Sequence, residues 1–411
     1  MKKHILIIAQ YFYPEQFRIN DICSEWVKRG YKVTVVTGIP NYPQGKYYEG
    51  YGLLKKRKET YNGIEIIRIP LIPRGHNSIM LALNYVSFVV SGFIWKVFTR
   101  IKADYVFIFE VSPMTQALPG VWYAKKRKIP CYLYVQDLWP ENVEIITGIT
   151  NKHVIGAIGK MVDYIYTRCT KIFTTSNSFV KSIENRCVPA EKIEYWPQYA
   201  EDFYVPLMKT SIQEIQDDED TFNIIFAGNI GNAQGLDILP KTAAILKEKK
   251  LHINICFNIV GDGRYKPTLD GLVHSNNVQE MFKFIPKQPA TRIPEFMAAS
   301  DAAFLCLTKS PLFAMTIPAK LQSYMACGIP IIASADGETE AIITEAKAGL
   351  CSPAGDAKKL ADVIIELSSK SNEQLNQLGI KSREYYDRNF NKQELLNRMD
   401  RYLGSKEILE V

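Results

Sequence analysis

The stretch FAGNIGNAQGLD, residues 226–237, decides how the chain is expected to fold. It continues the apolar run FNII, which has the composition of a buried strand, and it leads into an apolar segment of helix length. Gly228, Gly231 and Gly235 allow a close backbone approach, and the free N–H groups at the start of a helix bind anions. The stretch therefore predicts a strand, a phosphate-binding turn and a helix. Its spacing is not G-x-G-x-x-G, which argues against a nicotinamide dehydrogenase.

Short β-branched runs alternate with helix-length segments on both sides of this stretch. The candidate strands are ILIIA, KVTVVTG, IEIIRIP, YVFIFE, CYLYVQ and KIFTTS in the first half, and FNIIFAG, INICFNIVG, FKFIP, AAFLCL and PIIAS in the second. Such a series is typical of parallel sheets that helices cover on both faces. We expect two doubly wound α/β domains, over residues 1–200 and 221–381, and a linker over 201–220. The acidic triplet at 218–220 is expected to be a solvated hinge rather than a metal-binding DxD motif.

Composition and charge fit a globular protein of a reducing compartment. The chain has 411 residues and is 47% apolar, and its eight cysteines form no CxxC pair, so we expect free thiols. The five histidines lie too far apart in sequence for a metal site. Residues 1–200 carry 27 Lys and Arg against 15 Asp and Glu, whereas the remainder carries 23 against 28. The first half is thus expected either to have an ordinary solvated surface or to face an anionic membrane or lipid phosphate.

The longest apolar segment is NSIMLALNYVSFVVSGFIWKVF, residues 77–98. Its length is close to that needed to span a bilayer, but Asn84, Ser87, Ser91 and Lys96 interrupt it. A buried or groove-lining helix is the favoured interpretation. The alternative is a monotopic helix that lies in the membrane interface. The N-terminal apolar run is too short for the core of a signal peptide and fits a first strand better.

A second anion-binding signal is FAMTIPAKLQSYMACGIPIIAS, residues 313–334. Pro318 suits the first turn of a helix, Thr316 suits its cap, and Gly328 suits its end. Lys320 would then lie in the first turn, where the ammonium and the helix dipole attract the same phosphate. The alternative for Lys320 is an ordinary exposed helix lysine.

These motifs together resemble a family 4 glycosyltransferase of the GT-B fold. The resemblance rests on FAGNIGNAQGLD, NIVGDG, PAKLQSYMACGIPIIAS and ETEAIITEAKAGLCSPAGD, and in the first half on YFYPE, YVQDLWPEN, TTSNSFVKSI and YWPQYAEDFYVP. It is strongest to bacterial transferases of O-antigen, capsule and exopolysaccharide synthesis, which include N-acetylfucosaminyl transferases. The resemblance implies two Rossmann-like domains that face each other across a cleft, and a C-terminal helix over residues 382–411 that crosses back to the first domain. It also implies retention of configuration, with no metal and no cofactor.

The resemblance assigns the nucleotide-sugar donor to the second domain. The expected donor-binding residues are Gly228, Asn229, Gly231, Gln234, Gly261, Gly263, Lys320, Gln322, Ser323 and Glu340, with Glu338 as the alternative to Glu340. The chain departs from the family where two glutamates are common, because Met315 and Ser323 stand there. Asn229 and Gln234 replace the usual arginine and lysine of the phosphate turn, which places more weight on Lys320.

Carboxylates of the first domain are the candidates for handling the acceptor hydroxyl. Glu15, Glu110, Asp137 and Glu141 each follow a predicted strand, at the edge where open α/β sheets bind ligands. Asp137 is favoured, because the strand CYLYVQ runs directly into it. The simpler alternatives are a helix cap for Asp137 and a surface ion pair for Glu15.

The glycine-free turn AQYFYPEQFRINDIC, residues 9–23, is expected to bind the acceptor. Tyr13 and Glu15 suit sugar rings and hydroxyls, and Arg18 suits a phosphate. The assigned catalytic residues are Asp137, Glu15 and Lys320.

The expected function is transfer of a sugar, UDP-linked and N-acetylated, to a lipid-linked saccharide in bacterial surface polysaccharide synthesis. The enzyme would be cytoplasmic and peripheral at the inner membrane face, with no nucleic-acid partner. The alternatives are a non-hydrolysing nucleotide-sugar epimerase and a degenerate protein that only binds nucleotide sugars.

Overall fold

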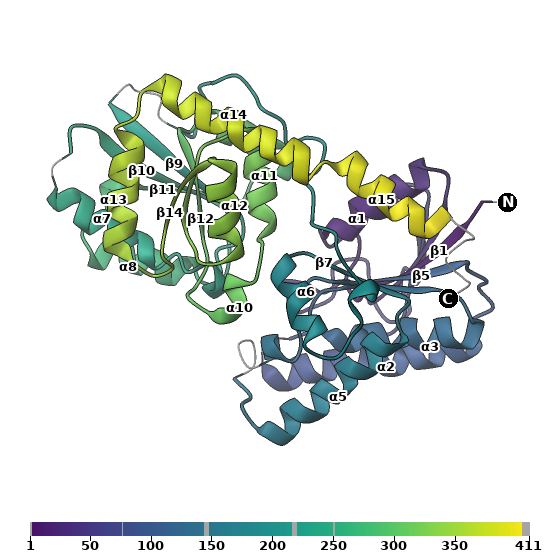
Figure 1. Cartoon of the computed structure of the whole chain (residues 1–411). Helices are drawn as coiled ribbons and strands as arrows, with labels where there is room; N and C mark the ends of the chain where they lie inside the picture. The colour runs from purple at the N-terminus through teal and green to yellow at the C-terminus, as the bar shows by residue number, and fades with distance from the viewer. Residues whose placement is uncertain (1, 76, 144–147, 216–219, 250, 405–411) are drawn as a thin grey trace. The chain divides into compact units, whose positions relative to one another are not determined.

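A computed structural model describes residues 2–75, 77–143, 148–215, 220–249 and 251–404. The chain divides into two compact units, of which unit 1 comprises Met1–Trp196 with Arg398–Val411, and unit 2 comprises Pro197–Asn397 (Figure 1). The division falls at residues 196 and 197, a few residues before the expected domain end at 200. Most of the acidic triplet of the expected linker, at 218–220, and the last residues of the chain lie outside the described residues.

Unit 1 is built on an eight-stranded sheet in the order β3-β4-β2-β1-β5-β6-β7-β8. All neighbouring strands are parallel except the antiparallel pair of β3 and β4. The strands are β1 His4–Ile8, β2 Lys32–Thr37, β3 Lys58–Tyr61, β4 Ile64–Arg68, β5 Tyr105–Glu110, β6 Cys131–Val135, β7 Lys171–Thr174 and β8 Ile193–Tyr195. The central strands are buried along nearly their whole length, as expected for a sheet covered on both faces.

Helices cover both faces of this sheet. They are α1 Arg18–Lys28, α2 Ser78–Phe98, α3 Leu118–Arg127, α5 Lys152–Arg168 and α6 Asn177–Glu184. Figure 1 shows α2, α3 and α5 on one face and α1 on the other. The chain runs outward in both directions from the neighbouring strands β1 and β5, so that the loops after these two strands diverge and leave room for a ligand.

Unit 2 repeats this plan with a six-stranded parallel sheet in the order β11-β10-β9-β12-β13-β14. The strands are β9 Thr221–Ala227, β10 Asn254–Val260, β11 Phe282–Ile285, β12 Ala302–Cys306, β13 Ile331–Ser334 and β14 Gly349–Ser352. The helices are α7 Ile238–Glu248, α8 Lys266–Ser275, α9 Ile293–Ala298, α10 Pro311–Ala314, α11 Ala319–Cys327, α12 Glu338–Ala346, α13 Ala357–Ser368, α14 Asn372–Asn389 and α15 Lys392–Gly404. Here β9 and β12 are the neighbours from which the chain runs outward.

The C-terminal segment differs from the expected single helix that starts near residue 382. It consists of α14 and α15, which are separated because Phe390 turns inward and is 1% exposed. The Asn391 side chain then accepts hydrogen bonds from the backbone N–H groups of Gln393 and Glu394 (3.0 and 3.1 Å) and so starts a new helix. The boundary between the units falls within α15, after Asn397.

The end of α15 packs on unit 1. Arg398 donates to the Glu194 carboxylate (3.0 Å), and Asp400 forms an ion pair with Arg29 (2.5 Å). Tyr132 on β6 donates to the backbone carbonyl of Tyr402 (2.9 Å). Contacts with the end of α1, with β6 and with β8 therefore fix the end of α15 on unit 1.

Ser78–Phe98 form a helix with Asn77 as its N-cap, but it is not the buried helix that was one half of the favoured interpretation, and the groove-lining half stays a prediction. Within α2 only Asn84, Phe88 and Gly92 are buried. Among the described residues α2 is the one helix long and apolar enough, by length and composition, to cross a membrane. Its burial pattern differs from that of an ordinary helix of a globular protein, because polar Asn84 faces inward beside Phe88 while most of the large apolar side chains are exposed.

Candidate active site

The glycine turn after β9 lies directly beneath Lys320. Gly228 has a φ of 148°, which favours glycine, and its N–H donates to the Val260 carbonyl (2.9 Å). A Cβ atom on Gly228 would lie 2.5 Å from Cε of Lys320. Glycine is therefore required here so that the lysine side chain can cross the backbone.

A second glycine turn, after β10, packs against the first one. Gly261 also has a φ of 148°, and a Cβ atom on it would lie 2.0 Å from the Gly228 carbonyl oxygen. A Cβ atom on Gly263 would lie 2.1 Å from the carbonyl oxygen of Ile230, whose N–H donates to the Asp262 carbonyl (2.9 Å). The glycines at 261 and 263 thus hold the two turns together, a packing role that the sequence analysis did not foresee.

Lys320 lies in the first turn of α11, as the sequence predicted. Tyr324 of the same helix accepts a hydrogen bond from the Ala227 N–H (3.3 Å), which fixes α11 to the end of β9. The Lys320 ammonium lies 4.9 Å from the ring centroid of Phe226. Among the described residues no carboxylate lies within ion-pair distance of it, and burial lowers the pKa of Lys320 to about 8. An uncompensated ammonium at a helix N-terminus is an anion site.

The cap of α11 differs from the expected one. Pro318 is the N-cap residue, while the Thr316 hydroxyl donates to the Leu312 carbonyl (3.0 Å) and so belongs to the end of α10. Gly328 ends the helix with a φ of 66°, as expected.

Gln322 is a buried polar side chain of α11. It is 1% exposed, and neither its amide oxygen nor its amide nitrogen has a hydrogen-bond partner among the described residues. The neighbouring Ser323 hydroxyl donates to the Ala319 carbonyl (3.2 Å) and is thereby occupied. Because an unpaired buried amide costs free energy, Gln322 is the better candidate for a polar ligand group.

The remaining predicted donor residues surround the two turns or lie in α12. Gln234 accepts a hydrogen bond from the Gly231 N–H (3.1 Å) and so stabilises its own turn, whereas Asn229 is exposed. Glu340 is exposed in the first turn of α12, and Glu338, its alternative, is half-buried in the same turn.

Glu15 in unit 1 has a positioning role. Its carboxylate accepts hydrogen bonds from the backbone N–H groups of Phe12 (3.3 Å), Asn41 (2.8 Å) and Tyr42 (2.6 Å). Burial raises the pKa of Glu15 to about 7, although these three hydrogen bonds act in the opposite direction. The side chain therefore ties the turn after β1 to the loop after β2. The alternative of a surface ion pair for Glu15 is wrong because the residue is 2% exposed, whereas its acceptor-binding and catalytic roles stay predictions.

Tyr13 and Arg18 flank this turn. The Tyr13 ring stacks on Tyr61 of β3 with centroids 3.8 Å apart, and its carbonyl accepts a hydrogen bond from Arg68 (2.6 Å). Arg18 starts α1, and two of its guanidinium nitrogens are buried, near Tyr134 at the end of β6. Tyr13 thus packs within the unit, while Arg18 reaches the sheet edge.

The predicted carboxylates after β5 and β6 do lie together. Glu110 is fully buried, and the backbone N–H groups of Gln136 and Asp137 face its carboxylate. Burial, and secondarily the nearby Asp137, raise the pKa of Glu110 well above its usual range. Asp137 accepts a hydrogen bond from the Ser112 N–H (2.6 Å), and burial raises its pKa as well. Glu141 has one buried oxygen and, like Glu110, lies near Tyr166.

Sequence reasoning missed a group of residues at the same sheet edge. Arg74 follows β4, Tyr42 follows β2, and Tyr85 lies on α2. The positional rule that identified Glu110 and Asp137 applies also to Arg74 and Tyr42, because each of these two lies in a loop after a parallel strand. Nothing local in the sequence shows that Tyr85 would reach them.

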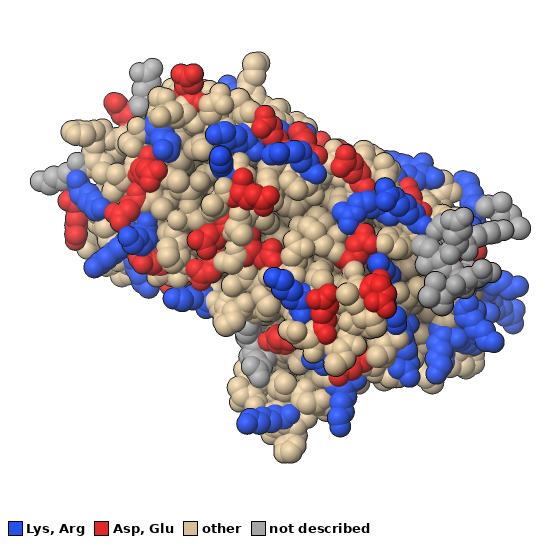
Figure 2. All heavy atoms as spheres, in the orientation of Figure 1, with Lys and Arg blue, Asp and Glu red and all other residues tan. Residues whose placement is uncertain are grey.

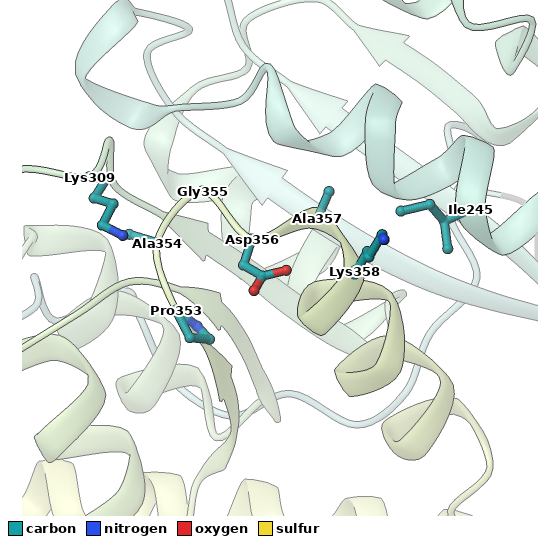
Figure 3. A pocket seen from close by; sticks show the side chains of 8 residues that line it. All are labelled: Ile245, Lys309, Pro353, Ala354, Gly355, Asp356, Ala357 and Lys358. Carbon is teal, nitrogen blue, oxygen red and sulfur yellow. The ribbon is translucent and has the colours of Figure 1, made fainter.

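A shallow pocket of about 480 Å³ lies elsewhere in unit 2 (Figure 3). Its lining residues are Ile245, Lys309, Pro353, Ala354, Gly355, Asp356, Ala357 and Lys358. None of these was predicted as a site residue. Asp356 accepts a hydrogen bond from the Lys359 N–H (3.0 Å) and so caps α13. The pocket therefore lies at the N-terminal end of α13.

Comparison with known proteins agrees with this architecture. Residues 208–385 match the family Glycosyl transferases group 1. The chain is 25% identical over 355 residues to a protein of Escherichia coli K12 named as a colanic acid biosynthesis glycosyl transferase, WcaI, a match that covers 82% of this chain and 84% of that protein. It superposes on sucrose-phosphate synthase from Thermosynechococcus elongatus with a TM-score of 0.74, 14% identity and coverage of 98% of both chains. It also superposes on Anabaena HepE in complex with UDP and glucose, with a TM-score of 0.70, 15% identity and coverage of 98% and 99%.

Two Rossmann-like domains with parallel sheets therefore define a GT-B fold. The chain is a glycosyltransferase whose second unit contains the group 1 domain. The sequence-based predictions of the fold class and of the enzyme class are confirmed.

Proposed function

We propose that this enzyme transfers a sugar from a nucleoside diphosphate donor, which unit 2 binds, to a lipid-linked saccharide, which unit 1 binds. The carrying observation is the ammonium of Lys320, which crosses Gly228 at the start of α11 without a carboxylate partner among the described residues. A diphosphate supplies the missing negative charge. Gln322 is positioned on the same helix to meet a polar group of the donor.

Transfer requires stabilisation of the departing diphosphate. The bond between the anomeric carbon and the diphosphate oxygen breaks, and the acceptor hydroxyl forms the new bond on the same face. The hydroxyl proton moves to the departing phosphate oxygen. In this proposal Lys320 and the N–H groups at the start of α11 balance the leaving charge without a metal ion, and Asp137 orients the acceptor hydroxyl.

UDP and an N-acetylated amino sugar are the proposed nucleotide and sugar. Support for UDP comes from the structural similarity to HepE, which was solved with UDP and glucose. Support for a role in bacterial surface polysaccharide synthesis comes from the similarity to WcaI, named for colanic acid biosynthesis. The N-acetyl group rests on the resemblance in sequence alone.

The outward face of α2 supports a peripheral position at the inner face of the cytoplasmic membrane. Eight large apolar side chains are exposed along the helix at intervals of three or four residues: Ile79, Leu83, Val86, Val90, Phe93, Ile94, Val97 and Phe98. A continuous apolar stripe of this kind suits the boundary between headgroups and acyl chains. We name these eight residues the α2 stripe.

Positive charge surrounds the C-terminal end of the α2 stripe. The exposed cations there are Arg100, Lys102, Lys125, Lys126 and Lys128. Lys126 joins the two elements, because its ammonium donates to the carbonyls of Lys96 (3.1 Å) and Val97 (3.0 Å). No Asp or Glu occurs between Glu65 and Asp104. Figure 2 shows Lys and Arg side chains gathered over the end of unit 1 where α3 lies in Figure 1. This charge complements anionic lipids, which we propose as the surface that the stripe contacts.

The transferase proposal is tested by incubating the purified protein with UDP-N-acetylglucosamine and membrane lipid extract that contains lipid-linked saccharide. We expect UDP release that requires the lipid extract. An NMR spectrum of the nucleotide sugar alone should stay unchanged. Interconversion of donors in the absence of acceptor would instead show an epimerase, and binding without turnover in a panel of UDP-, GDP- and dTDP-sugars would show a degenerate protein.

The membrane proposal is tested by co-sedimentation with phosphatidylglycerol vesicles at low salt. Val90→Glu places a charge in the α2 stripe, where the side chain is 52% exposed, so that the fold is preserved. Ile380→Glu in unit 2, at a position 49% exposed, is the matched control. We expect Val90→Glu alone to reduce sedimentation. Equal sedimentation of the two variants, or conversion of a wild-type dimer to monomers by Val90→Glu, would contradict the proposal.

A further inference from the structure

Arg74 lies in a group of tyrosines at the edge of the unit 1 sheet. It belongs to the segment between β4 and α2, and its backbone N–H donates to the side-chain oxygen of Asn41 (2.9 Å). Gly75 adds a second link, since its N–H donates to the Gly45 carbonyl (3.0 Å). The backbone around Arg74 is thus fixed to the loop after β2.

The guanidinium contacts aromatic side chains from three different segments. Its central carbon lies 5.4 Å from the ring centroid of Tyr42, which in turn lies 5.5 Å from the ring centroid of Tyr11. Tyr11 is 2% exposed, and its hydroxyl accepts a hydrogen bond from Gln10 (3.3 Å) and also pairs with the Arg74 side chain. Tyr85, in the second turn of α2, interacts electrostatically with Arg74.

The groups that surround this guanidinium are mainly tyrosine hydroxyls. Among the described residues no carboxylate lies within ion-pair distance of Arg74, and the groups that act on its charge are the three tyrosines. Burial lowers the pKa of Arg74, but the tyrosines act in the opposite direction and leave it above the usual value. The side chain is therefore a permanent, partly desolvated cation surrounded by neutral hydroxyl groups. Such a group favours an anion with several acceptor oxygens, and the planar guanidinium fits phosphate best.

The position of this cation identifies the source of the phosphate. Arg74 precedes Asn77, the N-cap of α2, by three residues, so it lies at the start of the helix that carries the α2 stripe. Asn84 on α2 donates to the Ile72 carbonyl (2.6 Å) and accepts from Gln10 (2.7 Å), which holds the helix against the end of β1. Tyr85 also interacts with Asp137, the proposed acceptor-orienting carboxylate. Tyr85 therefore links the surroundings of Arg74 to those of Asp137.

We propose that Arg74 and the three tyrosine hydroxyls around it bind the phosphate or diphosphate of the lipid-linked acceptor. The inference rests on the proposed function and assigns to Arg74 the role that the sequence analysis gave to Arg18. The ligand is a phosphorylated long-chain lipid with a sugar attached to the phosphate. The chain extends along the α2 stripe, and the sugar extends toward Asp137.

The test measures binding of farnesyl diphosphate and of farnesol to the full-length protein by calorimetry. Farnesyl diphosphate carries the lipid and the phosphate without the sugar, and farnesol carries the lipid alone. We expect Arg74→Ala to weaken binding of farnesyl diphosphate by about tenfold or more and to leave farnesol binding unchanged. Arg74→Lys should restore only part of the affinity, because lysine lacks the planar fork. Tyr42→Phe, which removes one hydroxyl and keeps the ring, should weaken binding by a smaller factor.

Arg168→Ala is the matched control. Arg168 is exposed on unit 1 and also lies over a tyrosine, with its guanidinium carbon 3.7 Å from the Tyr164 ring centroid. The Arg168→Ala variant should bind farnesyl diphosphate with the affinity of the wild type. Wild-type binding by Arg74→Ala, or an equal loss of farnesol and farnesyl diphosphate, would overturn the proposal.

Two further measurements separate this site from its alternatives. Co-sedimentation with phosphatidylglycerol vesicles should be the same for Arg74→Ala and wild type; a selective loss of vesicle binding with intact farnesyl diphosphate binding would show a site for bilayer headgroups instead. In the transfer assay Arg74→Ala should raise the KM for the lipid acceptor and leave UDP affinity unchanged. Binding of farnesyl diphosphate needs no turnover, so failure of the transferase proposal remains distinguishable from failure of this one.

Discussion

The two units place opposite kinds of turn at equivalent positions. In unit 2 the turn after β9 contains three glycines, and its backbone lies against Lys320 and against the second glycine turn. In unit 1 the turn after β1 contains no glycine, and side chains hold it in place. The Glu15 carboxylate accepts hydrogen bonds from three backbone N–H groups, and the Tyr11 ring stacks on Phe17 with centroids 5.4 Å apart. One turn brings the backbone close to a cation, whereas the other is built from aromatic rings, hydroxyls and a carboxylate.

In the proposed function, this difference allows one strand-and-helix plan to serve two substrates. A diphosphate favours a closely approaching backbone together with positive charge, and glycine permits the close approach. A saccharide needs flat apolar surfaces with hydroxyl and carboxylate partners, which require side chains. Substitutions in one turn should therefore affect the donor, and substitutions in the other should affect the acceptor or the stability of unit 1.

The largest expected effect comes from Lys320→Ala. Loss of the ammonium removes the charge that balances the departing diphosphate, so kcat/KM should fall by about 10³-fold. Steady-state kinetics with UDP-N-acetylglucosamine checks this. Lys309→Ala removes an exposed lysine of unit 2 and should retain activity close to wild type. Wild-type activity of Lys320→Ala would contradict the assigned role.

Glu15→Ala should destabilise unit 1 without weakening donor binding. Removal of the carboxylate leaves the N–H groups of Phe12, Asn41 and Tyr42 without their acceptor, which costs about 2–3 kcal/mol of the free energy of unfolding. Urea denaturation followed by fluorescence gives this value, and calorimetry with UDP gives the affinity. The exposed Glu49→Ala is the control. A loss of UDP affinity at unchanged stability would reverse the assignment of the two turns.

Gly228→Ala should weaken UDP binding by about tenfold, because a residue with a side chain is strained at a φ of 148° and its Cβ displaces Lys320. Gly271→Ala, in α8, is the control because a Cβ atom there meets open space. Calorimetric titration with UDP measures both variants. Equal UDP affinity in Gly228→Ala and wild type would mean that the glycine turn does not position the lysine.

The smallest effect is a dependence of donor affinity on pH. UDP favours the protonated form of Lys320, whose pKa in the free protein is about 8. Affinity should therefore be highest below pH 8 and should fall by about threefold between pH 7.5 and 8.5 as the free lysine loses its proton. The terminal phosphate of UDP is already ionised over this range. A profile that is flat across pH 8, or that is unchanged by Lys320→Arg, would show that Lys320 does not contact the diphosphate.

Much of the fold was predictable because its signals are local. Runs such as YVFIFE and CYLYVQ are buried strands, and the pattern from Pro318 to Gly328 indicated α11 and the position of Lys320 in its first turn. The hairpin of β3 and β4 was missed, although Asn62 and Gly63 between them form the expected turn pair with positive φ values. Edge strand β14, with the sequence GLCS, has too little β-branched content to be recognised.

The roles of the unit 1 residues were not predictable, since they depend on distant contacts. From the sequence alone Glu15 could be a surface acid, because the N–H groups that it binds belong to Asn41 and Tyr42, about 26 residues away in sequence. Arg74 lies in the loop before α2, and its contact with Tyr85 appears only in the folded structure, where α2 brings Tyr85 to its side. The helix α2 itself has the composition of a buried helix, and only the placement of Asn84 on its inner side shows that the apolar face is outside.

The central claim is that the glycine turn of unit 2, and not the turn after β1, binds the donor diphosphate. Hydrogen–deuterium exchange of the full-length protein with and without saturating UDP tests it most directly. The amides of residues 228–235 and of residues 319–323 should exchange more slowly with UDP, while those of residues 10–18 should be unaffected. Protection of residues 10–18 with no change at residues 228–235 would contradict the account.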